Sequence, residues 1–114
     1  MRICIDIDGV ICELRAADQN YADLRPISGA MEVIRRLRDD GHYIILQTAR
    51  HMKTTESNVG AVIARQGMVT LKWLADNGIE YDEIYFGKPW ADLYIDDNAL
   101  KFTSWNDVVE GLKN

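Results

Sequence analysis

The chain has 114 residues, 47% of them hydrophobic and 27% charged, a composition typical of one ordinary globular domain with no room for a second core. Its formal net charge of −5 argues against nonspecific binding to nucleic acid or to anionic membranes. No apolar stretch reaches the roughly 20 residues that span a bilayer, and Arg2 leads into carboxylates where a signal peptide would need an apolar region. We therefore expect a single cytoplasmic domain over residues 1–114, with Cys4 and Cys12 as reduced thiols.

The first strand is expected over residues 2–8, because an apolar run of Ile and Cys is typical of a buried strand in a parallel sheet. Asp6 and Asp8 interrupt this run, and the two-residue period of a strand points both carboxylates the same way. Gly9 then allows a sharp turn. Two like charges at the end of an apolar strand are unfavourable unless a cation such as Mg²⁺ offsets them. The alternative is that both aspartates simply end the strand in solvent, which the Ile-rich surroundings disfavour.

The first half of the chain continues with a flap, a helix and a second strand. Residues 9–27 are polar and mixed, without a clear period, and are expected to form a short flap. An amphipathic helix is predicted over residues 29–40, with Ser28 as its N-cap and Gly41 just beyond its C-terminus. A second apolar run over residues 42–49 predicts the next strand.

The second half repeats this alternation of helix and strand. The elements expected there are a helix over 59–77, strands over 81–86 and 92–96, a possible edge strand at Phe102, and a terminal helix over 104–113. Alternating strands and amphipathic helices predict right-handed crossovers and parallel pairing. The fold class expected is therefore α/β, a three-layer Rossmann-like parallel sheet with helices on both faces.

Polar side chains follow the predicted strands at their carboxyl ends, where open α/β sheets bind ligands. They are Asp6, Asp8, Thr48, Lys88, Asp96 and Asp97. Taken singly, each has an ordinary explanation, as a strand-end hydroxyl, a surface lysine or a turn residue. Their joint placement at one edge predicts a single site. Carboxylates, a lysine and a hydroxyl suit phosphoryl transfer, with one carboxylate as nucleophile and a second as general acid and base.

Four short motifs occur in order and cover the chain from residue 2 to about 100. They are Asp6-Ile7-Asp8-Gly9-Val10, Thr48 after an apolar strand, Lys88 in Gly-Lys-Pro, and Asp96-Asp97 after Tyr-Ile. In this order they resemble the motifs of the haloacid dehalogenase-like (HAD) phosphohydrolase superfamily. The resemblance implies that Asp6 attacks phosphorus, and that Asp8 is the general acid and base while its backbone carbonyl meets Mg²⁺. It further implies that Thr48 and Lys88 hold the phosphoryl group, and that Asp96 ligates Mg²⁺ with support from Asp97.

The segments between the motifs are short, so the chain resembles a member of the superfamily without a cap domain. The run Thr-Ala-Arg-His-Met-Lys-Thr further resembles small phosphatases encoded with capsule and surface-polysaccharide genes. This implies hydrolysis of a small sugar or polyol phosphate in an open site that a second copy of the chain could close. The candidate substrate-binding residues are Gly9, Ala49, Arg50, His51, Lys53 and Trp90, with Arg15 and Arg25 as further candidates.

Three other functions are weighed against this hydrolase. A receiver domain of a response regulator has a similar length and residue set, but it would carry the phosphorylated Asp at the end of the third strand, where this chain has Tyr85-Phe86-Gly87. A HAD-like binding or scaffold protein without turnover remains an alternative. A phosphomutase would use the same chemistry but normally needs a cap to retain its intermediate.

Overall fold

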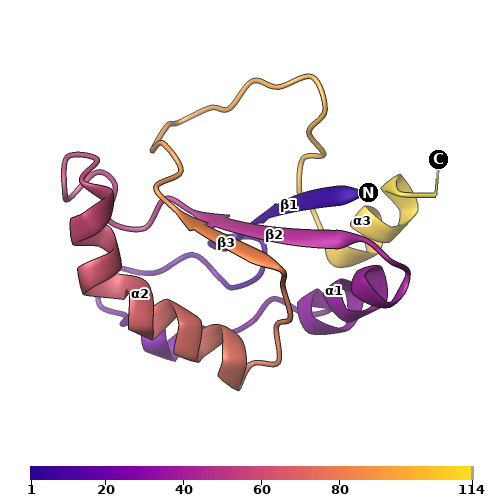
Figure 1. The fold of residues 1–114 in the computed structure, drawn as a ribbon, viewed down its shortest axis with the longest axis horizontal. Coiled ribbons are helices and arrows are strands. Elements are labelled where there is room, and N and C mark those ends of the chain that lie inside the picture. The colour runs from indigo at the N-terminus through magenta and orange to yellow at the C-terminus, as the bar shows by residue number, and fades with distance from the viewer. Residues whose placement is uncertain (114) are drawn as a thin grey trace.

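The computed structural model describes residues 1–113 as three parallel strands with helices packed on the sheet (Figure 1). In chain order the elements are β1 (Arg2–Asp6), the 3-10 helix η1 (Tyr21–Asp23), α1 (Ala30–Asp39), β2 (Tyr43–Thr48), α2 (Val59–Asp76), β3 (Glu83–Phe86) and α3 (Trp105–Gly111). The strand order is β1-β2-β3, and Leu46 of β2 pairs with Ile5 on one side and Ile84 on the other. The fold class is α/β with a parallel sheet and no cap domain, as predicted.

One face of the sheet carries the hydrophobic core. Ile5, Ile44 and Leu46 are buried on this face, because side chains alternate along each strand. Buried residues of all three helices join the same core cluster. Cys4 and Asp6 lie on the opposite face of β1 and are less buried. The described residues therefore form one helical layer, where the sequence predicted helices on both faces.

Helix α1 is amphipathic, as its sequence predicts. Its apolar stripe is buried against the sheet, while its Arg and Asp side chains face solvent. The predicted N-cap at Ser28 is wrong, because Gly29 occupies the cap position with φ +91° and no side chain caps the helix. Gly41, with φ +92°, follows the last turn in the position predicted for it.

Helix α2 packs one of its sides against the core. Val62, Thr70 and Trp73 are buried, whereas Val59 and Ile63 are 38% and 50% exposed. The buried positions are spaced by eight and three residues, which places them on one side of a helix with 3.6 residues per turn. A polar residue, Thr70, therefore faces the core, while Ile63 faces solvent.

The flap over residues 9–27 is tied down at several points. The indole N–H of Trp73 donates to the Leu24 carbonyl at 2.7 Å, and the indole N–H of Trp105 donates to the Val10 carbonyl at 2.9 Å. Ile11 and Cys12 are fully buried in the core. The flap is thus a packed part of the domain, lying next to the carboxyl end of β1.

Residues 87–101 differ most from the sequence prediction. The strand expected over 92–96 is absent, as is an edge strand at Phe102, and Figure 1 shows this segment arching over the side of the sheet away from α1 and α2. Local hydrogen bonds take the place of a strand ladder: Tyr94 Oη donates to the Pro89 carbonyl, and the Asp97 amide donates to Asp96 Oδ1.

No helix among residues 1–113 is both long enough and apolar enough to cross a membrane.

Candidate active site

Asp6 ends β1 at the carboxyl edge of the sheet and faces Lys88. Its Oδ2 lies 3.4 Å from the Lys88 ammonium, and its Oδ1 accepts the Ile7 amide at 3.0 Å. Burial raises the pKa of the Asp6 carboxyl, while the nearby Lys88 ammonium opposes this rise. The site therefore holds a partly buried carboxylate beside a single cationic side chain, which is the arrangement expected of a nucleophile next to a group that binds anions.

Lys88 reaches Asp6 because the chain turns sharply after β3. Gly87 has φ +103°, and a Cβ there would lie 2.9 Å from Val59 Cγ2, so the turn requires glycine. The amides of Gly87 and Lys88 both donate to the Thr48 carbonyl, at 3.2 and 3.1 Å. The end of β2 thus fixes the position of the lysine backbone.

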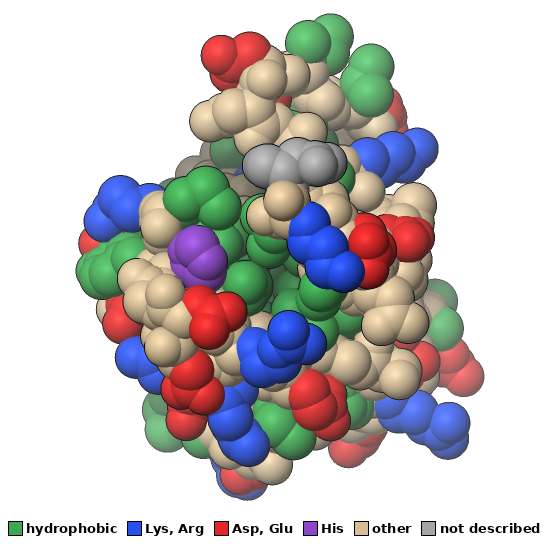
Figure 2. Space-filling view, turned by 90° about the vertical axis from the view of Figure 1, so that its right-hand side faces the viewer, with side chains coloured by type: hydrophobic (Ala, Val, Ile, Leu, Met, Phe, Trp, Pro, Cys, Tyr) green, Lys and Arg blue, Asp and Glu red, His purple; other side chains and the backbone are tan. Residues whose placement is uncertain are grey.

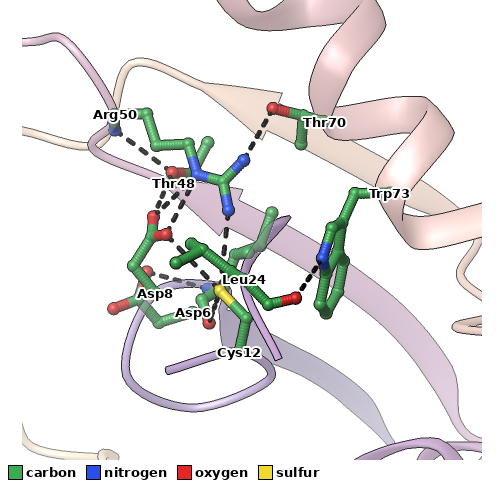
Figure 3. Close-up of polar contacts among 9 residues, drawn as sticks. Asp6, Asp8, Cys12, Leu24, Thr48, Arg50, Thr70 and Trp73 are labelled. Carbon is green, nitrogen blue, oxygen red and sulfur yellow. Dashed lines mark hydrogen bonds and ion pairs between the residues drawn. The ribbon is translucent and has the colours of Figure 1, made fainter. Parts of the chain in front are cut away.

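Asp8 lies just after β1 and has partners different from those of Asp6. Its Oδ2 accepts the Thr48 hydroxyl at 2.9 Å, and its Oδ1 accepts the Arg50 Nε–H at 2.9 Å (Figure 3). The Asp8 side chain remains 21% exposed, whereas Thr48 is fully buried. Thr48 and Arg50 therefore hold the Asp8 carboxylate, which is still partly exposed to solvent. Its negative charge adds to the burial that raises the pKa of Asp6.

Arg50 corrects one sequence prediction. It was expected to contact substrate, but the residue is only 3% exposed and its guanidinium points into the protein. Besides Asp8, it donates to Thr70 Oγ1 at 3.0 Å and to Cys12 Sγ at 3.5 Å, and it lies 4.2 Å from the centre of the Tyr21 ring. The loop after β2 turns the side chain inward because these partners surround it.

The other residues predicted to bind substrate lie around the same edge of the sheet. Gly9 forms the turn after Asp8 with φ +85°. Ala49 accepts the Met52 amide through its carbonyl, and His51 packs edge-on against Tyr21. The Lys53 ammonium lies 4.6 Å from the centre of the Trp90 ring. These last two exposed side chains form one small surface beside the site, and their contact with substrate stays a prediction.

Asp96 and Asp97 are not brought to this cluster. Both are exposed on the segment 87–101, and the Asp97 amide donates to Asp96 Oδ1 at 2.8 Å. Within residues 1–113, no three His, Cys, Asp or Glu side chains are grouped closely enough to hold a metal ion. The expected cluster of four carboxylates is therefore not assembled, and what the structure gathers is Asp6, Asp8, Thr48 and Lys88.

Three residues of the site were missed in the sequence. Cys12, Tyr21 and Thr70 all contact the Arg50 guanidinium, although they are far from it along the chain. Burial raises the pKa of the Cys12 thiol to about 12, so the thiol stays neutral beside Asp8. Of the three, only Thr70 could have been recognised from the sequence, because it is a polar residue on the same side of α2 as the buried Val62 and Trp73.

One solved structure decides the relationship of the chain. A protein from Vibrio cholerae is 33% identical with a TM-score of 0.81, and the match covers 88% of this chain and 82% of that one. The two chains belong to one family. No protein-family model matches the chain, and the search of curated proteins found no match either.

A second solved structure resembles the chain in its fold. The D,D-heptose 1,7-bisphosphate phosphatase from B. bronchiseptica, solved with magnesium and phosphate, is 18% identical with a TM-score of 0.52. The match covers 99% of this chain but only 64% of the phosphatase. At this identity the likeness concerns the fold alone, and the chain shares the fold of that phosphatase.

Proposed function

We propose that the protein is a Mg²⁺-dependent phosphomonoester hydrolase in which Asp6 is the nucleophile. The observation that carries the proposal is the pairing of Asp6 Oδ2 with the Lys88 ammonium at 3.4 Å, beside an Asp8 carboxylate held by Thr48. Two carboxylates with different partners suit two different tasks, attack on phosphorus and proton transfer. The HAD-like fold, shared with a phosphatase, supports this reaction class.

The reaction proceeds in two displacements. In the first, an Asp6 oxygen bonds to phosphorus, the bond from phosphorus to the leaving oxygen breaks, and the Asp8 carboxyl gives its proton to that oxygen. In the second, a water oxygen bonds to phosphorus, Asp8 takes a proton from the water, and the bond between phosphorus and Asp6 breaks. The sum is ester plus water giving alcohol plus phosphate, with both carboxyl groups restored. Lys88 stabilises negative charge on the transferred group throughout.

The residues present fit Mg²⁺, because this ion is held by one or two carboxylates together with substrate phosphate oxygens and water. Asp6 would supply a carboxylate oxygen and Asp8, by the motif resemblance, its backbone carbonyl, which leaves the Asp8 carboxyl for proton transfer. When bound, the ion would neutralise charge shared between the phosphoryl group and Asp6. Asp96 and Asp97 remain candidates for a further ligand through the motif resemblance.

The substrate we propose is a small sugar or polyol phosphate. The flap and the loop after β2 leave the site open, as expected for a chain without a cap domain. Lys53 and Trp90 form an exposed basic and aromatic surface, which suits a hydroxyl-bearing leaving group. The solved phosphatase that shares the fold is described as acting on a heptose bisphosphate, which supports the choice of sugar phosphates for testing. A second copy of the chain closing the site is part of the same proposal.

The test is a phosphate-release assay with p-nitrophenyl phosphate, followed by a panel of sugar, polyol and nucleotide phosphates. We expect turnover by the wild type with Mg²⁺, reversible loss with chelator, and a loss of at least ~10³-fold in Asp6→Asn, which lacks a nucleophile. Asp39→Asn, an exposed carboxylate of α1, is the matched control and should stay active. Activity retained by a folded Asp6→Asn protein would remove Asp6 from its role, and an inactive wild type would favour a binding or scaffold protein.

A further inference from the structure

Arg50 is the most completely surrounded charged side chain at this edge of the sheet. Its side chain is 1% exposed, and each arm of the guanidinium has a partner (Figure 3). Nε donates to both Asp8 oxygens at 2.9 and 3.2 Å, while the two terminal nitrogens donate to Thr70 Oγ1 and Cys12 Sγ. The Tyr21 ring covers one face of the group. Because each nitrogen already has a partner and the side chain is almost fully buried, the guanidinium is not open to a ligand.

Stability alone does not account for such a group. Removing a guanidinium from water costs several kcal/mol, and apolar side chains of similar volume often give an equal or greater stability than a buried ion pair. The partners instead fix the direction of the Nε–H, because a planar guanidinium held at its other two nitrogens cannot rotate. The Asp8 carboxylate accepts the hydrogen bond from this fixed Nε–H.

The same residue also fixes the second partner of Asp8. The Arg50 amide donates to Thr48 Oγ1 at 3.1 Å, and the Thr48 hydroxyl then donates to Asp8 Oδ2 at 2.9 Å. Arg50 therefore orients Asp8 twice, once through its side chain and once through Thr48. Asp6 receives no contact from Arg50 among the hydrogen bonds and ion pairs of residues 1–113.

We propose that Arg50 is a positioning residue for proton transfer: it holds the Asp8 carboxyl where it exchanges a proton with the leaving alcohol and with the attacking water. The inference rests on the proposed function and assigns Arg50 a task other than substrate contact. Thr70 supports it from α2 by holding the far end of the guanidinium. Loss of the guanidinium leaves the nucleophile and Lys88 in place but lets Asp8 move away from the leaving oxygen.

The leaving group distinguishes this role from a structural one. Phenyl phosphate releases a basic phenolate that needs a proton, whereas p-nitrophenyl phosphate releases an anion that departs without one. We expect Arg50→Lys to lower kcat/KM for phenyl phosphate by ~10²-fold and for p-nitrophenyl phosphate by no more than about tenfold, since general acid catalysis is worth 10²–10⁴-fold. The ratio kcat/KM is the right quantity because it reports only the steps up to departure of the leaving group. KM for p-nitrophenyl phosphate should not rise, because Arg50 does not touch the substrate, and a slower second displacement, which also uses Asp8, lowers KM.

A second pair of variants changes the acceptor of the guanidinium and leaves Arg50 itself intact. Thr70→Ser keeps the hydroxyl that accepts from Arg50, and Thr70→Val removes it at nearly constant volume. We expect Thr70→Ser to match the wild type on both esters, and Thr70→Val to lose ~3- to 10-fold in kcat/KM on phenyl phosphate alone. Guanidinium ion added to Arg50→Ala, if that protein folds by circular dichroism, should restore part of the phenyl phosphate activity. Arg36→Ala, an exposed arginine of α1, is the control.

The outcomes separate this inference from the proposed function. An inactive wild type would overturn both. An active wild type with equal losses on the two esters in Arg50→Lys and Thr70→Val, and no rescue by guanidinium, would overturn the positioning role while leaving Asp6 as the nucleophile. A raised KM with unchanged kcat would overturn it in favour of substrate binding.

Discussion

The two ends of the sheet each carry an aspartate paired with an arginine, and the two pairs differ in burial. At the amino end, Arg38 lies 3.1 Å from Asp82, and the two side chains are 34% and 24% exposed. At the carboxyl end, Arg50 lies 2.9 Å from Asp8 with its own side chain 1% exposed. Figure 2 faces the amino end and shows acidic and basic side chains side by side there. Arg38 and Asp82 line a shallow hollow of about 350 Å³ at this end.

This difference supports placing the proposed active site at the carboxyl end. An exposed ion pair contributes little and tolerates change, because water solvates either partner when the other is removed. A buried pair is costly to form and leaves an uncompensated charge when broken, so it is retained where orientation matters. Substitutions made at one end of the sheet at a time test this comparison.

The largest difference between the two ends should come from Lys88. Replacing it with Gln removes the cation 3.4 Å from Asp6 and the charge that stabilises the transferred phosphoryl group. We expect kcat for p-nitrophenyl phosphate to fall by ~10²-fold or more, as when one charge-stabilising donor is lost. Arg38→Gln, which breaks the exposed pair at the amino end, should leave kcat unchanged. Similar losses in the two variants would end the distinction between the ends.

The hydrogen bond that anchors the flap should contribute to the free energy of unfolding. Trp73→Phe removes the indole N–H that donates to the Leu24 carbonyl at 2.7 Å and leaves that buried carbonyl without its partner. We expect the free energy of unfolding to fall by about 2 kcal/mol, measured by urea denaturation. Trp90→Phe is the matched control, since Trp90 is 54% exposed, and it should change stability by less than about 0.5 kcal/mol. Equal changes would show that the Leu24 contact does not anchor the flap.

The proposed metal-binding role of the carboxylates in residues 87–101 is tested by measuring how much Mg²⁺ the activity requires. The motif resemblance assigns Asp96 to Mg²⁺, although the structure places it away from Asp6 and Asp8. We expect Asp96→Asn to raise the Mg²⁺ concentration needed for half-maximal activity by ~tenfold or more, because metal affinity depends steeply on its carboxylates. Asp92→Asn, in the same segment, is the control. An unchanged Mg²⁺ requirement would mean that Asp6 and Asp8 suffice.

Most of the fold followed from periodicity. The apolar runs around Ile5 and Leu46 predicted β1 and β2, and the stripe through Val33 and Leu37 predicted α1, because strands and helices expose residues at different periods. The meeting of Asp6 with Lys88 also followed, since the carboxyl ends of parallel strands share one edge.

The rest depended on contacts that are remote in sequence. The inward turn of Arg50 is determined by Cys12, Tyr21 and Thr70, and nothing local distinguishes it from an arginine facing substrate. The segment around Tyr94 and Ile95 has strand composition, but composition does not specify a pairing partner, and local hydrogen bonds formed instead. The same limit explains why Asp96 was expected at the metal.

The smallest effect should come from Asp82, at the amino end. The Ile44 amide donates to Asp82 Oδ2 at 2.8 Å and is the main cause of the lowered pKa of this carboxyl, with Arg38 adding to it. A carboxyl whose pKa is lower in the folded state stabilises the fold above its ordinary pKa, and this contribution is lost as pH falls through the folded value. Asp82→Asn should therefore lower the urea midpoint at about pH 6, and the difference from the wild type should shrink at about pH 3. In the control Asp39→Asn, the difference in urea midpoint from the wild type should be the same at both pH values. If the difference for Asp82→Asn is also the same at both pH values, the effect comes from packing and not from the charge of Asp82. Phosphatase activity should be unaffected by Asp82→Asn, because the charge it removes lies at the end of β2 opposite Thr48 and Asp8.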